Sequence, residues 1–186
     1  MSVQTQRWLF TVQEYHLMNE AGVFGEDDRV ELIEGEIIQM AAIGTRHASC
    51  VKRLIAVFYD LERRRAIIGV QDPIQLTERT EPQPDVVLLQ PRADYYETAH
   101  PIPSEVLLLV EVSDSTVNFD RDVKVPNYAR SGIQEVWLWD LEANRLEVYR
   151  EPTANGYTSI QRFERGEIVA PLAFPDFQVS VDLILG

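Results

Sequence analysis

The sequence predicts an α/β protein in which a mixed central β-sheet is flanked by helices and followed by a β-rich C-terminal third. Three observations support this fold class. Residues 106–112 hold six apolar residues in seven, which is typical of a central strand covered on both faces. Residues 46–65 carry apolar side chains at three- and four-residue spacing, which indicates an amphipathic helix. Residues 135–140 and 145–150 alternate with period two, as the strands of a hairpin do.

The first elements are predicted from a capping motif and a turn. Thr11 and Glu14 are spaced as a capping box, which predicts that a short helix begins at this point. Residues 29–33 and 36–40 flank a turn that contains Gly35, which is typical of a β-hairpin. The amphipathic helix then follows, and we expect it to span about Arg46 to Arg65.

The middle of the chain is expected to build the sheet. A helix is predicted over residues 120–131, ended by Gly132. Because Pro126 lacks an N–H, we expect a regular helix to start near Asp122 or later, or to kink at the proline. The strands of this region are expected near residues 67–70, 74–76, 86–89 and 106–112.

The C-terminal third is predicted to be mostly strand. The hairpin of residues 135–150 turns at residues 142–144, and shorter strands are expected near 157–163 and 168–170. Trp137 and Trp139 share one face of their strand, where we expect them to pack in the core or at a dimer surface, with base stacking as the alternative. The apolar tail of residues 177–185 is expected to pack back on the domain.

Composition indicates a globular protein. The 186 residues fit one domain, 1–186, and 45% are hydrophobic and 25% charged. The sequence contains no apolar run long enough for a transmembrane helix and no signal-peptide pattern at its start. Cys50 is the only cysteine, which excludes an internal disulfide and makes a cytoplasmic location the expectation. Three widely spread histidines, His16, His47 and His100, show no zinc-binding spacing.

The net charge of −13 counts against nucleic-acid binding unless positive charge is concentrated locally. Residues 46–65 do concentrate it, and a solvated helix face is the alternative interpretation. The candidate DNA contacts in this segment are Arg46, Lys52, Arg53 and Arg63.

Three charged residues form the candidate catalytic site. Asp85 stands at the head of one apolar run and Glu111 at the tail of another, although an unpaired buried carboxylate is costly. If their strands are neighbours, both carboxylates can bind one Mg²⁺, with the backbone carbonyl of Val112 as a third ligand. Such a metal activates water for attack on phosphorus, and the ammonium of Lys124 can orient that water or stabilise the charge that develops on the phosphate.

These residues also resemble a known signature. Asp85 followed by Glu111, Val112 and Ser113 is similar to the PD-(D/E)XK nuclease motif, with Ser113 where the lysine of the motif usually stands. The segment from Ser115 to Asp140 resembles the bacterial Uma-two family of restriction endonucleases, in which the lysine lies on the helix after the strand. The matching positions are Ser115-Thr116, Asp120, Lys124, Tyr128-Ala129, Gly132-Ile133, Glu135-Val136-Trp137 and Asp140, together with residues 31–36 and His47 earlier in the chain.

The resemblance runs from about Val30 to the C-terminus. It implies a PD-(D/E)XK endonuclease-like domain over residues 1–186 with a restriction-endonuclease-like core. It implies hydrolysis of DNA phosphodiester bonds by metal-activated water, with Mg²⁺, or Mn²⁺ as a substitute. The implied catalytic residues are Asp85, Glu111 and Lys124.

Five further residues are candidate accessory groups. Glu31 and Glu34 can support the site or act as a third metal ligand, or lie on a solvated hairpin edge. His47, at the start of a helix, can meet a phosphate or be a satisfied polar residue. Ser113 lacks the glycines of a nucleophile elbow, which disfavours a nucleophilic role. Asp120 is the fifth accessory candidate, because it matches a position of the family pattern.

Two other functions remain open at this point. The serine at position 113 and the acidic charge also fit a non-catalytic interaction module that keeps a nuclease-like fold. The acidic surface fits a phosphodiesterase for a small or modified nucleotide better than it fits long duplex DNA. If duplex DNA is cut on both strands, a two-fold homodimer is the natural assembly.

Overall fold

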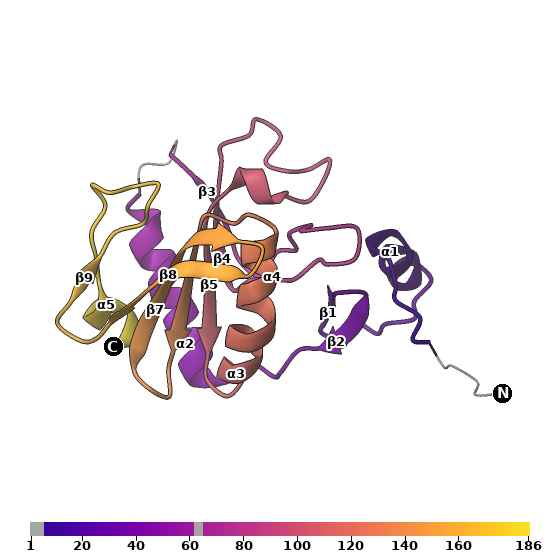
Figure 1. Ribbon diagram of the computed structural model, residues 1–186, viewed down its shortest axis with the longest axis horizontal. Coiled ribbons are helices and arrows are strands. Elements are labelled where there is room, and N and C mark those ends of the chain that lie inside the picture. The colour runs from indigo at the N-terminus through magenta and orange to yellow at the C-terminus, as the bar shows by residue number, and fades with distance from the viewer. Residues whose placement is uncertain (1–5, 62–64) are drawn as a thin grey trace.

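A six-stranded mixed sheet forms the centre of the protein (Figure 1). The computed structural model describes residues 6–61 and 65–186. The strand order is β3-β4-β5-β6-β7-β8, with β5 and β6 parallel and the other neighbours antiparallel, so the predicted fold class is confirmed. The strands of this sheet are β3 (Ile67–Gly69), β4 (Val86–Leu89), β5 (Val106–Ser113), β6 (Glu135–Asp140), β7 (Arg145–Thr153) and β8 (Gly156–Phe163).

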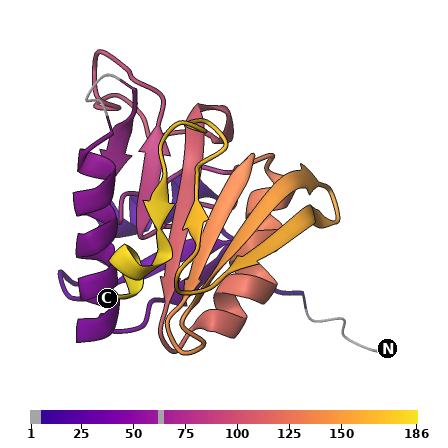
Figure 2. The ribbon, with the colours of Figure 1, turned by 90° about the vertical axis from the view of Figure 1, so that its left-hand side faces the viewer.

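Helices cover both faces of this sheet. Figure 2 shows α2 (purple) on one side of the sheet and the helical stretch between β5 and β6 (salmon) on the other. Because the connection between the parallel strands β5 and β6 crosses one face of the sheet, it brings its helix over the end of β5. The helices are α1 (Val12–Glu20), α2 (Thr45–Tyr59), α3 (Val117–Phe119), α4 (Val125–Arg130) and α5 (Val181–Leu185), with a π-helical turn η2 (Asp120–Lys124) and a 3₁₀ turn η1 (Pro103–Glu105).

Side-chain alternation along β5 explains the two layers of the core. Leu108, Val110 and Val112 pack with the apolar face of α2, whereas Leu109 packs in the cluster on the α4 side. Glu111 lies two residues after Leu109 on the strand and therefore on the same face, so its side chain also faces α4. The strand is therefore apolar on both faces except at the end that carries Glu111 and Ser113.

The helical stretch after β5 begins at Val117, but α4, the regular α-helix that contains Pro126, begins at Val125, later than Asp122 as expected. The wide turn η2 makes this possible: the N–H of Val125 bonds to the carbonyl of Asp120, five residues back. This bonding pattern lets Pro126, which has no N–H to donate, lie in the first turn of α4.

The predicted strand at residues 74–76 is wrong. The backbone N–H groups of Ile74, Gln75 and Leu76 donate to the carbonyls of Pro82, Pro101 and Thr80, so they join turns and loops rather than one strand partner. The long helix is shorter than predicted, because α2 ends at Tyr59.

A smaller unit lies beside the sheet. Strands β1 (Val30–Ile33) and β2 (Glu36–Gln39) form the predicted hairpin, and the capping box of Thr11 and Glu14 begins α1. Figure 1 places both on the side away from the C-terminus. A backbone bridge between Leu32 and Glu81 connects the hairpin to the segment that leads into β4.

The C-terminal tail returns to the core, as predicted. Its short strands β9 (Ile168–Val169) and β10 (Val179–Ser180) pair with each other. Val181 and Ile184 of α5 are buried in the cluster that contains Trp137 and Trp139, whose side chains are fully buried. The core interpretation of the two tryptophans is thus confirmed. Within the described part of the chain, no helix has the length and apolarity that a bilayer crossing needs.

Candidate active site

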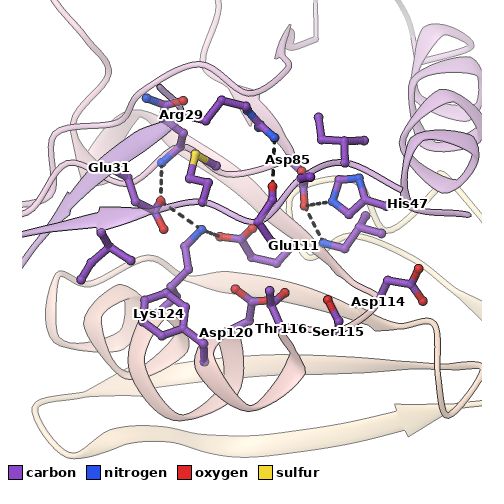
Figure 3. A pocket seen from close by; sticks show the side chains of 18 of the residues that line it. Arg29, Glu31, His47, Asp85, Glu111, Asp114, Ser115, Thr116, Asp120 and Lys124 are labelled. Carbon is purple, nitrogen blue, oxygen red and sulfur yellow. Dashed lines mark hydrogen bonds and ion pairs between the residues drawn. The ribbon is translucent and has the colours of Figure 1, made fainter. Parts of the chain in front are cut away.

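One cavity collects most of the predicted site residues (Figure 3). Its volume is about 590 Å³, and it is bounded by the β1–β2 hairpin, the first turn of α2, the end of β5 and η2. The polar groups that line it include Glu31, His47, Asp85, Glu111, Asp120 and Lys124.

Asp85 is fixed by three donors. Its Oδ2 accepts from the backbone N–H of Val112 at 2.9 Å and lies 3.0 Å from Nε2 of His47, and its Oδ1 accepts from Gln71 at 3.2 Å. Burial raises the pKa of Asp85, but the hydrogen bond and charge of His47 and the N–H of Val112 outweigh it and lower the pKa. Asp85 is therefore an ionised carboxylate in a buried position.

Asp85 immediately precedes β4, and Glu111 lies on the neighbouring strand β5. Val86 pairs with Val110 in the antiparallel register of β4 and β5, so one step further places Asp85 opposite Glu111. Residues opposite one another in such a ladder have Cβ atoms about 5 Å apart. The condition for a shared cation, that the two strands be neighbours, is met.

Lys124 is buried between two glutamates. Its Nζ lies 2.8 Å from Oε1 of Glu111 and 3.3 Å from Oε2 of Glu31, and the lysine is 4% exposed. Tyr128, one helical turn further on, donates its hydroxyl to the same Oε1 at 2.5 Å. The lysine therefore points into the cavity from η2, and the tyrosine fixes the orientation of the Glu111 carboxylate.

The protonation states follow from burial and neighbouring charge. The pKa of Glu111 is raised to about 8. Burial and the carboxylates of Asp120, Asp85 and Glu31 raise it, and together they outweigh Lys124, which lowers it. Burial lowers the pKa of Lys124, but the attraction of Glu111 and Glu31 outweighs it and raises the pKa above the usual lysine range. Lys124 is therefore charged at neutral pH, and Glu111 holds its proton more tightly than an ordinary glutamate does.

His47 belongs to the site as well. Burial lowers its pKa, but the hydrogen bond that it donates to Asp85 and the negative charge of that carboxylate together outweigh burial, so the pKa is raised. Its other ring nitrogen, Nδ1, is buried and has no hydrogen-bond partner among the described residues. His47 faces Asp85 from the first turn of α2 and lines the cavity wall.

Of the remaining accessory candidates, Glu31, Asp120 and Ser113 belong to the site, whereas Glu34 lies apart from the cavity. Glu31 lines the cavity and accepts from the backbone N–H of Gln83 at 3.1 Å. Ser113 is fully buried and donates to Oδ2 of Asp120 at 2.5 Å, so its hydroxyl positions that carboxylate. Glu34 is exposed, pairs with Arg130 and is not among the residues that line the cavity.

Two of the candidate DNA contacts, Arg46 and Arg53, bind other groups of the chain. Arg46 pairs with Asp114 at 3.0 Å and also donates to a backbone carbonyl, and Arg53 donates to the carbonyl of Ile184 at 3.3 Å. Both arginines line a separate, smaller cavity. Lys52 is exposed, and Arg63 lies outside the described residues. Their contact with DNA stays a prediction.

Sequence reasoning missed three polar residues of the site. Tyr128 follows Lys124 by four residues, a spacing that places both on one helix face. Gln83 precedes Asp85 by two residues, the period of extended backbone. Gln71 gave no signal in the sequence; its positive φ of 56° shows only in the structure.

The protein thus combines a mixed sheet, buried carboxylates at the end of its central strands, and a buried lysine on the adjoining turn η2. The same fold occurs in a solved structure from Anabaena variabilis described as "a putative nuclease belonging to DUF820", with a TM-score of 0.72 and 18% sequence identity over 95% of this chain and 97% of that chain. The model of the Uma2 family, described as "Putative restriction endonuclease", matches residues 12–182. The chain therefore belongs to the Uma2 family, and the resemblance drawn from its motifs is confirmed. No curated protein matches the chain.

Proposed function

We propose that the protein is a Mg²⁺-dependent endonuclease that hydrolyses phosphodiester bonds of DNA. The observation that carries the proposal is the buried ammonium of Lys124, bound to Glu111 and Glu31 in a cavity that Asp85 also lines. Structural lysines rarely lie 4% exposed at a cavity wall, because the desolvation of the charge must be compensated. Membership of a nuclease-like family agrees with this chemistry.

The donor set fits a hard divalent cation. Glu31, Asp85, Glu111 and Asp120 bring four buried carboxylates to the cavity, against the ammonium of Lys124 and the imidazole of His47. With all four carboxylates ionised, this is a surplus of at least two negative charges among buried groups, which one divalent cation would neutralise. When bound, such a cation supplies a Lewis acid that stabilises charge on a phosphoryl oxygen and makes water more acidic.

Two carboxylates and one carbonyl are the proposed ligands. Asp85 and Glu111 face one another across β4 and β5. The N–H of Val112 donates to Asp85, and because the N–H and C=O of a strand residue point to the same edge, its carbonyl is directed to that edge too. Oxygen ligands of this kind select Mg²⁺, with Mn²⁺ as a substitute.

The remaining groups of the site position its carboxylates and stabilise the charge that develops on the substrate. The ammonium of Lys124 supplies a fixed positive charge for the negative charge that develops on the phosphate. His47 keeps Asp85 ionised, and Tyr128 orients Glu111. These contacts preorganise the site before any substrate enters it.

A cleavage assay with purified protein tests the proposal. Supercoiled and linear DNA are incubated with Mg²⁺, Mn²⁺ or a chelator, using wild type, Asp85→Ala and Lys124→Ala. Cleavage is expected only with the metals; wild type and the control should cleave alike, Lys124→Ala about 10²–10³-fold more slowly, and Asp85→Ala not detectably. The control is Arg130→Ala, which removes an exposed cation from the same helical stretch. If wild type leaves every DNA and RNA intact with either metal, the chain is a non-catalytic module and the proposal is wrong.

A small or modified nucleotide is the second candidate substrate. The net charge of −13 and a cavity of about 590 Å³, a size typical of small-ligand sites, favour it. A salt titration separates the two substrates. Duplex affinity falls by roughly 0.9 log unit per phosphate contact for each tenfold rise in salt, whereas the affinity of a mononucleotide changes little.

A further inference from the structure

Three segments that are distant in sequence meet outside the candidate active site. His16 lies in α1, Glu81 in the segment before β4, and His100 in the loop before η1. One potential ligand atom from each lies within 4.8 Å of the other two. The sequence shows no zinc-binding spacing among the histidines, because the fold rather than a local motif brings these three residues together.

The glutamate of this group is buried and incompletely satisfied. Glu81 is 2% exposed, and its Oε1 lies 2.7 Å from Nε2 of His16. Its other oxygen, Oε2, is buried and has no hydrogen-bond partner among the residues described. A buried carboxylate oxygen without a partner is costly, so a simple His16–Glu81 ion pair leaves half of this carboxylate unexplained.

We propose that His16, Glu81 and His100 form a second metal site, which binds a transition-metal ion of the Zn²⁺ class. Two imidazoles and a carboxylate are the ligands such ions prefer, whereas Mg²⁺ prefers oxygen alone. Ligand atoms on one Zn²⁺ lie at most about 4.2 Å apart, so small side-chain rotations complete the site. His100 is exposed and His16 is half-exposed, so solvent supplies the remaining ligand.

The site has a structural consequence for the cavity. The backbone of Glu81 bridges to Leu32 of β1, and two residues later the N–H of Gln83 donates to Glu31. A metal at Glu81 would therefore join α1 and the loop of His100 to the segment that leads to Asp85. An ion that binds the folded chain and not the unfolded chain stabilises the fold, here by holding together segments that are far apart in sequence.

Calorimetric titration of the chelator-treated full chain with Zn²⁺ tests the proposal. The background is Asp85→Ala, so that zinc binding at the proposed catalytic site is suppressed and failure of that site does not affect the result. One Zn²⁺ per chain is expected. Adding His100→Ala is expected to weaken binding at least about 10–100-fold, the loss seen even for residues that only support a ligand.

Two controls make the outcome decisive. His100 is exposed, so its removal leaves the core intact, and His16→Ala gives an independent test of a second ligand. His47→Ala removes a histidine outside the group and is expected to leave this binding unchanged. Equal zinc affinity with and without His100, or a Kd above about 1 mM in the Asp85→Ala background, would overturn the proposal.

Discussion

Replacing Glu111 with glutamine is expected to stabilise the metal-free protein at alkaline pH and to remove its activity. The folded state raises the pKa of Glu111 from 4.5 to about 8, chiefly through burial. Between these two values the folded protein retains a proton that the unfolded chain has lost. Because the folded state binds more protons, the free energy of unfolding falls as pH rises from about 4.5 to 8.

The size of this effect follows from the shift. One pKa unit corresponds to about 1.36 kcal/mol, so a rise from 4.5 to about 8 corresponds to at most about 5 kcal/mol of stability lost above pH 8. Glutamine imitates the protonated carboxyl group at every pH, and its carbonyl can still accept from Tyr128 and Lys124. Glu111→Gln should therefore match wild type near pH 4.5 and exceed its stability above pH 8.

Urea unfolding in a chelating buffer at pH 5, 7 and 8.5 measures the difference. The matched control is Glu147→Gln, since Glu147 is also buried but its pKa is lowered: hydrogen bonds from Tyr149 and Arg121 outweigh burial. A carboxyl group whose pKa is lowered in the folded state stabilises the protein at any pH above the pKa that it has in the unfolded chain. Glu147→Gln should therefore lose stability at pH 7 and 8.5. If Glu111→Gln and wild type show the same pH slope, the reasoning about the site is refuted.

Three further predictions concern the ammonium of Lys124, the binding of Mg²⁺ and the hydrophobic core. Lys124→Ala should lower kcat about 10²–10³-fold while Mg²⁺ still raises the melting temperature; equal cleavage rates would contradict the role of the ammonium. Apparent Mg²⁺ affinity, measured by calorimetry, should rise about tenfold per pH unit towards pH 8 and level off above it, because binding requires ionised Glu111; Glu111→Gln should bind weakly with no such rise. Trp137→Ala should lower the free energy of urea unfolding by about 3–5 kcal/mol, since the side chain is fully buried, whereas Trp8→Ala, at an exposed position, should change it by less than about 0.5 kcal/mol.

Periodicity predicted the elements whose partners are other regular elements. Residues 106–112 are apolar because both faces of β5 are covered, and the pattern of residues 135–150 reports one hairpin. The same reasoning failed at residues 74–76, where apolar side chains are buried but the backbone N–H groups bond to turns and loops. It also did not predict the π-helical turn ahead of Pro126, through which the helical stretch extends back to Val117. Burial is encoded in residue type, whereas backbone partners depend on distant segments.

The candidate site divides in the same way. Asp85 and Glu111 are visible in the sequence because a charge at the end of a buried strand is unusual. The contacts of Glu31 with Lys124 and of His47 with Asp85 join residues 93 and 38 positions apart, which no local pattern encodes. The family pattern drew attention to Lys124 and His47, but only the fold shows what each of them contacts.

Comparison of the buried glutamates within this one sheet separates the candidate site from the structural core. Glu135 is bound by two nitrogens of Arg150 and by the indole N–H of Trp137, and Glu147 by nitrogens of three arginines. The chain thus surrounds a buried glutamate with guanidinium groups where the role is structural. Glu111 instead shares one lysine with Glu31, and that lysine does not offset the effect of burial, so the pKa of Glu111 rises. A protein that compensates two of its strand glutamates so fully, and leaves a third to share one ammonium beside a cavity, places an incompletely compensated carboxyl group where a cation would bind and displace its proton.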